Sequence, residues 1–304
     1  MEELYGKLLA LLLILFLGGV SQRRLKLPDS FYGSANTLVI RVTLPAMILC
    51  SMDKDFSPRT LRVSGALLLI AAGAFLAVIA GLEVWRRFSS LPAKQLGLYQ
   101  YLVLVGNTAF MGYPVIQALY GSDGVFYASV FNLVHNVVTF SYGVCLFQRD
   151  APIQWRGLLG NACLMSTLAG ILLFLSPFHL PVFMNQTLDW VGSITIPLCL
   201  LSVGARMAGQ SWRELLRPGM AFWLSLVRTV LFPLLLIPVL RILGCSGVTL
   251  TVPAVIFATP MALTSGAFAG RYGADAAFAD RTVILSNLIA MVTLPVLAAV
   301  VMGL

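Results

Sequence analysis

The residues best suited to bind a small charged ligand lie inside two apolar segments that are interrupted near their middles. The first segment, residues 98–119, is interrupted by Gly106, Asn107, Gly112 and Pro114. Glycine lets a backbone leave helical geometry and proline lacks the N–H of a helical hydrogen bond, so we expect the helix to break here. Where it restarts, unpaired N–H groups and the positive end of the helix dipole can bind an anion, with Asn107 and Thr108 as additional donors.

A second apolar segment, residues 249–271, is interrupted in the same way. Its middle reads Thr259-Pro260-Met261-Ala262-Leu263-Thr264-Ser265. Two broken helices in corresponding places of two halves indicate the binding site of a membrane transporter. Thr259, Thr264 and Ser265 are further candidate donors to an anion. The alternative is structural: Thr264 and Ser265 cap their own half-helix, and Asn107 ties the first break together.

Three polar residues share one face of a third segment, residues 125–147. Asn132, His135 and Asn136 follow the i, i+3, i+4 spacing of a helix. Inside a bilayer such a face avoids lipid and lines a helix contact or a cavity. His135 titrates near neutral pH and is a candidate proton sensor, although a buried, neutral and hydrogen-bonded histidine is the interpretation we favour.

Two prolines and two arginines in other apolar segments are candidates for supporting roles. Pro45 and Pro197 are expected to bend their helices beside the breaks. Arg41 and Arg228 can each attract an anionic substrate along its path. Both lie close enough to a helix end for the side chain to reach the membrane surface, so we expect helix anchoring or packing. Thr43 and Thr195, two residues before the prolines, are weaker candidates for lining the site.

Membrane-spanning helices must position all of these residues. Of the 304 residues, 59% are hydrophobic and only 11% are charged, so the chain is predicted to be a polytopic membrane protein. The formal charge of +8 does not indicate nucleic-acid binding, because Lys and Arg fall in short hydrophilic breaks without interleaved aromatic residues. The five cysteines lack CxxC or Cys/His spacing and are interpreted as small core residues, and we predict neither a metal nor a cofactor.

Ten apolar runs are candidate membrane spans. They cover residues 4–20, 34–52, 63–84, 98–119, 125–147, 157–176, 187–207, 219–243, 249–270 and 276–302. The first run follows Lys7 without a small-residue cleavage site, so we expect a span and not a signal peptide. The connections are short, and no soluble domain is expected.

The basic residues predict the orientation of these spans. Twelve of them fall on one side, with Arg281 nearby: Arg23, Arg24, Lys26, Arg86, Arg87, Lys94, Arg149, Arg156, Arg206, Arg213, Arg217 and Arg271. The other side has five: Lys7, Lys54, Arg59, Arg62 and Arg241. By the positive-inside rule, we expect a cell inner membrane protein with both termini on the outer, periplasmic side.

The chain also repeats itself with an offset of 152 residues. Thr43-Leu44-Pro45 matches Thr195-Ile196-Pro197, and Tyr120-Gly121-Ser122-Asp123 matches Tyr272-Gly273-Ala274-Asp275. At this offset Asn287 aligns with His135 and joins the candidate site residues. Residues 1–150 and 151–304 are therefore predicted to form two repeats of five spans, and an odd number of spans makes the second repeat inverted. The two interrupted windows coincide, but their prolines lie at different ends.

The interrupted segments resemble those of a known family. Gly106-Asn107-Thr108-Ala109-Phe110-Met111-Gly112-Tyr113-Pro114 resembles the broken fourth helix of the auxin efflux carrier family, whose bacterial members often read Gly-Asn-Thr-Gly-Phe-x-Gly-x-Pro. Residues 195–204, 259–260, 285–287 and 293–295 are similar to the same family, and the resemblance covers essentially the whole chain. It implies ten helices in two inverted five-helix repeats, with crossed broken helices four and nine and with a scaffold and a transport subdomain.

The resemblance also implies a substrate class. Plant members carry indole-3-acetate, and some bacterial members carry small carboxylates such as malonate or malate. A homodimer is implied as well. The long cytoplasmic loop of many plant members is missing from the sequence, because spans five and six are joined through residues 148–156. This favours a compact bacterial-type carrier and disfavours auxin as the substrate.

The main alternative is a sodium- or proton-coupled transporter of the bile-acid-symporter or antiporter type. Such a transporter needs carboxylates at membrane depth, but the acidic residues fall at span ends or in loops, among them Glu83, Asp123, Asp189, Asp275 and Asp280. A membrane enzyme is disfavoured because the sequence has no HExxH, GxSxG or paired intramembrane aspartates. A receptor without transport activity is left open. We predict a carrier of small organic anions that alternates access around the crossed helices and needs no sodium.

Overall fold

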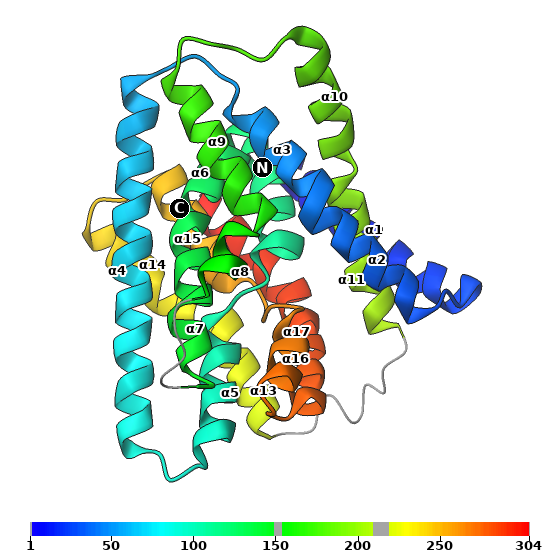
Figure 1. Cartoon of the computed structure of the whole chain (residues 1–304), viewed down its shortest axis with the longest axis vertical. Coiled ribbons are helices and arrows are strands. Elements are labelled where there is room, and N and C mark those ends of the chain that lie inside the picture. Colours follow the sequence, from blue (N-terminus) through cyan, green and yellow to red (C-terminus); the bar gives the residue numbers. More distant parts are fainter. Residues whose placement is uncertain (1, 149–153, 209–218, 304) are drawn as a thin grey trace. The chain divides into compact units, whose positions relative to one another are not determined.

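The computed structural model describes residues 2–148, 154–208 and 219–303, and all regular elements in these ranges are helices (Figure 1). The fold class predicted from the sequence, all-α, is therefore confirmed. Six described segments are long and apolar enough to cross a bilayer: Gly6–Leu25, Ser30–Met52, Pro58–Phe88, Val182–Met207, Met220–Ile242 and Ala276–Gly303. The count of ten spans and the inverted repeat stay predictions.

The helices follow one another with short connections. The first part of the chain forms α1 (Glu2–Leu25), α2 (Asp29–Leu38), the π-helical turn η1 (Val39–Thr43), α3 (Leu44–Met52), α4 (Pro58–Phe88), α5 (Ala93–Leu104), η2 (Thr108–Gly112), α6 (Tyr113–Phe140) and α7 (Tyr142–Cys145). The second part forms α8 (Trp155–Leu159), α9 (Ala162–Leu175), α10 (Val182–Ser193), α11 (Thr195–Met207), α13 (Met220–Leu226), η3 (Val227–Leu231), α14 (Phe232–Ile242), α15 (Val248–Ala258), α16 (Ser265–Arg271) and α17 (Ala276–Gly303).

Some predicted features lie outside the described residues. They are the boundary between the two predicted repeats at 150–151 and three of the basic residues used for orientation, Arg149, Arg213 and Arg217. The predicted connection between spans four and five is described, and it falls inside α6. There Gly121 has φ 62° and ψ −146°, a backbone conformation that glycine adopts readily, so α6 is two helices that meet at this residue.

Both predicted helix breaks are present, but the first lies earlier than its proline. α5 ends at Leu104, and the backbone is extended at Val105 with φ −96° and ψ 111°. Helical structure resumes at Thr108, so Pro114 stands near the start of the new helix and not at the break. α15 ends at Ala258 and α16 begins at Ser265, which confirms the second break.

Each of the three π-helical turns in the described ranges ends two residues before a proline. η1 is followed by Leu44-Pro45, η2 by Tyr113-Pro114 and η3 by Phe232-Pro233. A proline ring collides with the carbonyl group four residues before it, and the extra residue of a π turn moves that carbonyl group aside. The effect of Pro45 is therefore a local widening of the helix. Pro197 differs, because it lies in the first turn of α11 after α10 has ended.

The chain divides into two compact units. Unit 1 contains Met1–Leu67, Ala109–Leu133 and Arg156–Gln210, and unit 2 contains Leu68–Thr108, Val134–Trp155 and Ser211–Leu304. Each unit therefore takes segments from both halves of the chain.

Unit 1 is held together in part by glycines between α1 and α11. A Cβ atom on Gly18 would collide with the backbone of Leu201, and one on Gly204 would overlap the carbonyl oxygen of Leu15. Small residues let membrane helices approach until their backbones touch, which maximises the dispersion contacts that associate helices in lipid.

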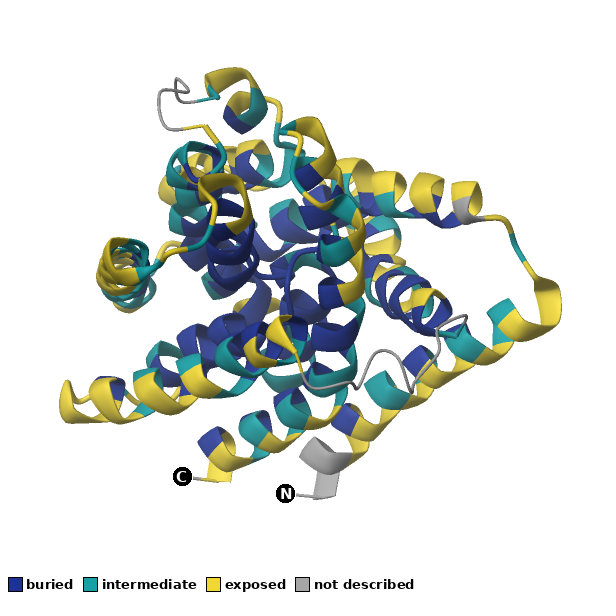
Figure 2. Cartoon of the chain, turned by 90° about the horizontal axis from the view of Figure 1, so that it is seen from below, coloured by how far each residue is buried: buried dark blue, intermediate teal, exposed yellow. Residues whose placement is uncertain are grey.

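Buried residues gather where helices of a unit face one another, whereas the outer sides of the long helices are exposed (Figure 2). The exposed side chains on α4 and α14 include Leu69, Leu76, Leu234 and Ile242. Soluble proteins rarely expose so much contiguous aliphatic surface, and a lipid environment accounts for it.

Candidate functional site

The two helix breaks meet in unit 2. The N–H of Asn107 donates to the carbonyl oxygen of Pro260 (2.7 Å), and the N–H of Ala262 donates to that of Val105 (3.1 Å). Each break thus satisfies an N–H or a carbonyl group that the other releases, as membrane depth requires. The paired segments, called the crossing, are residues 105–107 and 259–262.

A fully buried arginine joins the two half-helices that end at the crossing. Arg228 comes from η3 and is 0% exposed. Its Nε donates to the carbonyl oxygen of Thr259 (3.1 Å), and its Nη1 donates to those of Val103 and Leu104 (both 3.2 Å). Its Nη2 donates to the carbonyl oxygen of Ile256 (3.2 Å) and to Thr259 Oγ1 (3.3 Å). We call these five oxygen atoms the oxygen cage.

The oxygen cage places a positive charge at two negative helix ends. Val103 and Leu104 are the last residues of α5, and Ile256 lies in the last turn of α15. The C-terminus of a helix carries roughly half a negative charge, so the guanidinium offsets both ends. Among the described residues no Asp or Glu forms an ion pair with Arg228. Its five N–H donors are matched by five oxygen atoms, which leaves none for a ligand.

Of the two roles expected for Arg228, its position fits packing and not anchoring at the membrane surface. From the sequence alone, both Arg41 and Arg228 lie near enough to a helix end to reach the membrane surface. Arg41, in η1, is exposed and fits that expectation. Arg228 is instead packed in the interior, because the ends of α5 and α15 offer carbonyl groups that no helical N–H can satisfy.

Gly106 is required by the close approach of Arg228. A Cβ atom at this position would overlap the guanidinium group and crowd Thr259 Oγ1. Gly106 also forms the antiparallel bridge with Met261 at the centre of the crossing. The glycine is therefore required by lack of space and not by an unusual φ angle.

α17 supports the crossing through a serine that was not among the residues predicted from the sequence. Ser286 Oγ accepts the N–H of Met261 (3.1 Å) and donates to the carbonyl oxygen of Val283 (2.8 Å). The predicted site residue Asn287 follows it. Its Nδ2 donates to Val283 as well (2.8 Å), and its Oδ1 is buried without a hydrogen-bond partner among the described residues. The polar pair Ser286-Asn287 within an apolar helix was the available signal.

His135 is buried in unit 2, as expected, but it is less well satisfied than expected. It is 6% exposed, and its Nε2 has no hydrogen-bond partner in the described part of the chain. Its ring lies 5.6 Å from that of Phe75, and the Phe75 ring lies 4.9 Å from that of Phe257. The Phe257 ring in turn lies 5.7 Å from the guanidinium carbon of Arg228. Aromatic rings therefore connect the histidine to the oxygen cage.

The start of α16 offers less to an anion than the sequence suggested. Thr264 is the N-cap residue but makes no side-chain capping bond, and Ser265 Oγ is buried without a partner among the described residues. Gly266 packs so closely on the Asp280 carboxylate that an added Cβ atom would overlap it. A carboxylate of the protein already lies beside this helix start. Thr259 is also engaged, because its hydroxyl donates to Ile256 (2.6 Å) and accepts from Arg228.

The other predicted site residues are divided between the units. In unit 2, Asn107 and Thr108 are 3% and 8% exposed, and Asn136 is half-buried. Unit 1 contains Gly112, Pro114 and Asn132, together with the supporting residues Thr43, Pro45, Thr195 and Pro197. The crossing thus unites Asn107 and Thr259-Pro260, with Thr264, Ser265 and Asn287 on elements that adjoin it in unit 2.

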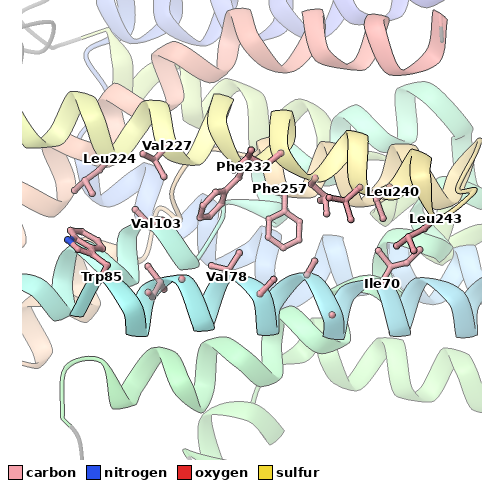
Figure 3. Close-up of a pocket in the computed structure, with 18 of the residues that line it drawn as sticks. Ile70, Val78, Trp85, Val103, Leu224, Val227, Phe232, Leu240, Leu243 and Phe257 are labelled. Atoms are coloured by element: carbon pink, nitrogen blue, oxygen red, sulfur yellow. The ribbon is translucent and has the colours of Figure 1, made fainter. Parts of the chain in front are cut away.

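An apolar groove of about 870 Å³ lies in unit 2 between α4 and the run α13–η3–α14 (Figure 3). Its lining includes Trp85, Trp223 and Leu240, and none of the described residues that line it is charged. Such a surface cannot compensate the desolvation of a carboxylate, so the groove is not the anion site. Its lining does include Val103 and Phe257, which also contact Arg228.

Half-helices that cross at their breaks, with a charge at their ends, are the site architecture of secondary transporters. The long apolar helices place the protein among membrane proteins, and the crossing resembles such a site. A family model described as "Membrane transport protein" matches residues 4–155 and 150–298. The chain belongs to this family of membrane transporters, the auxin efflux carrier family that the first break resembles.

Three relatives illustrate the match. An uncharacterized transporter of Methanothermobacter thermautotrophicus is 22% identical over 96% of both chains. One of Methanocaldococcus jannaschii is 24% identical over 62% of this chain and 68% of its own. A proposed malonate transporter of Rhizobium meliloti is 21% identical over 96% of this chain and 94% of its own.

Proposed function

We propose that this transporter carries small organic anions, carboxylates in the first place, by alternating access around the crossing. The observation that carries the proposal is the buried Arg228 without an acidic partner among the described residues. A buried charge is stable only when other charges or dipoles compensate it. Here the guanidinium cancels the negative ends of α5 and α15, so that the positive ends of the restarting helices remain for an anion.

Of the two helix starts, the one at Thr108 is the better anion site. Helical structure continues from Thr108 through η2 and α6 to Gly121, whereas the Asp280 carboxylate lies beside the start of α16. Asn107 and Thr108 are the side-chain donors proposed there. Ser265, His135 and Asn287 each have a buried polar atom without a partner among the described residues, and they are proposed as secondary contacts.

The substrate class is supported by one relative and by the compact chain. The Rhizobium meliloti relative is named for malonate, a small dicarboxylate. We therefore propose malonate and similar small carboxylates as the first substrates to test. Purified protein in proteoliposomes with a defined membrane potential should accumulate labelled malonate or a related acid when the potential favours anion movement. Moving one charge through 100 mV is worth about 2.3 kcal/mol.

Failure of every small mono- and dicarboxylate tested, by protein that is folded and correctly inserted, would reject this function. Binding without flux would favour the receptor alternative. We further propose that sodium is not needed, so flux in sodium and in choline media should be equal. Strict sodium dependence would contradict this, and a proton dependence that disappears in His135→Gln would make the histidine a coupling residue.

The proposed topology has ten spans in inverted repeats 1–150 and 151–304, with both termini on the periplasmic side of an inner membrane and a homodimeric assembly. Single cysteines introduced into a cysteine-free background test the orientation. Asp55→Cys, in the connection after α3, should react with a membrane-impermeant thiol reagent added outside, and Ser90→Cys, after α4, should not. The reverse labelling would refute the orientation.

A further inference from the structure

The oxygen cage around Arg228 has the composition of a monovalent cation site. It consists of four carbonyl oxygens and one hydroxyl oxygen, from Val103, Leu104, Ile256 and Thr259. In ion-coupled secondary transporters, carbonyl groups at the ends of broken helices are the ligands that hold the coupling ion. Here the equivalent groups at the ends of α5 and α15 hold a side chain of the protein.

We propose that Arg228 is the resident occupant of this cation site and takes the place of a soluble coupling ion. The two helix ends together present about one negative charge, and the guanidinium supplies one positive charge. The cage is therefore electrically complete without an ion from solution. If the protein is the carrier proposed above, it works without a bound cation, and this consequence for transport rests on the proposed function.

The shape of the cage favours a planar cation. The N–H groups of a guanidinium all point outward in its plane, and each of the five oxygen atoms lies 3.1–3.3 Å from one of its nitrogens. The Phe257 ring lies 5.7 Å from the guanidinium carbon, a separation that suits a cation–π contact. Gly106 leaves the space that the group needs. A free guanidinium ion should therefore fit an emptied cage better than a spherical sodium ion.

The test is chemical rescue of Arg228→Ala. Truncation leaves the cage oxygens without donors, so the variant should melt several degrees below the wild type in detergent. Guanidinium chloride at millimolar concentration, far below the molar range that unfolds proteins, should raise the melting temperature of the variant in a saturable way. Sodium chloride should act more weakly, and tetramethylammonium chloride at equal ionic strength should have no effect.

Arg41→Ala is the matched control. Arg41 also lies in a π-helical turn that precedes a proline, but it is exposed. Neither this variant nor the wild type should be stabilised by guanidinium. An equal response of all three proteins, or no saturable response of Arg228→Ala, would overturn the proposal.

A second pair of variants covers the case in which Arg228→Ala is not recovered folded. Arg228→Lys keeps a charge in the cage, whereas Arg228→Gln keeps hydrogen-bond donors without the charge. We expect sodium to raise the melting temperature of Arg228→Gln and to leave Arg228→Lys unchanged. Identical sodium responses would show that the cage does not select for charge, which would overturn the proposal. These melts contain no substrate, so their outcome is independent of whether carboxylates are transported.

Discussion

Substitution of Gly106 by alanine should disrupt the crossing. The added Cβ atom would occupy the position of Arg228 Nη2. Displacement of that nitrogen breaks its bonds to the Ile256 carbonyl oxygen (3.2 Å) and to Thr259 Oγ1 (3.3 Å). A hydrogen bond to a charged group contributes about 1.5–3 kcal/mol. Because both bonds are long, we take the lower limit, which gives a loss of about 3 kcal/mol.

The assay is thermal unfolding of the purified protein in detergent. A loss of that size corresponds to a melting temperature lower by about 5 °C in a chain of 304 residues. Gly73→Ala is the control, because Gly73 lies in helix α4 and an added Cβ atom would meet nothing within 4 Å. Its melting temperature should stay the same or rise slightly, since alanine favours helix. If Gly106→Ala melted like Gly73→Ala, the close packing of Arg228 against the first break would be wrong.

Three further predictions concern binding, pH and packing. Asn107→Leu should weaken carboxylate binding by about 1–3 kcal/mol while the protein stays folded, and unchanged affinity would remove Asn107 from the site. His179 Nδ1 lies 2.9 Å from Asp53 Oδ1, and this hydrogen bond raises the pKa of His179 above its usual value. The contact therefore stabilises the folded protein fully below a pH of about 6.5, and this stabilisation is lost as the pH rises through the raised pKa of His179. The difference in melting temperature between the wild type and His179→Gln should accordingly vanish at alkaline pH. Gly204→Ala should lower the melting temperature because its methyl group would collide with the backbone of Leu15, and an unchanged value would contradict the α1–α11 contact.

The helix breaks could be predicted because glycine, asparagine and proline together disfavour a continuous helix within an apolar run. The exact position of the first break could not be predicted, because Pro114 lies close enough to the break to suggest that it causes the interruption. In the structure η2 widens the helix before Pro114, and the backbone unwinds earlier, at Val105–Asn107. Local residue preferences do not distinguish these two ways of accommodating a proline.

The role of Arg228 was beyond the sequence for a different reason. An arginine in an apolar helix can reach water or be buried, and the choice depends on what lies opposite. Four of its five partners are the carbonyl groups of residues 103, 104, 256 and 259, separated from it by up to 125 positions, and only the fifth, Thr259 Oγ1, belongs to a side chain. Carbonyl groups of the backbone are present in every residue, so residue types do not show which of them bind an arginine. Arg41, which looks the same in sequence, is exposed.

The π turn η3 sets the angular phase of the helix that carries Arg228. Along residues 220–243, the side chains lining the apolar groove follow steps of one or three positions, except for a step of five from Val227 to Phe232. One extra residue turns everything beyond it by about 100° relative to a regular helix. Deleting Thr229, Val230 or Leu231 would restore the step of four of a regular helix and keep the leucines of α14 on the groove side, whereas a regular helix that kept every residue of η3 would turn them away from the groove. A single inserted residue lets one helix present a charge to the interior and a continuous apolar stripe on the groove side.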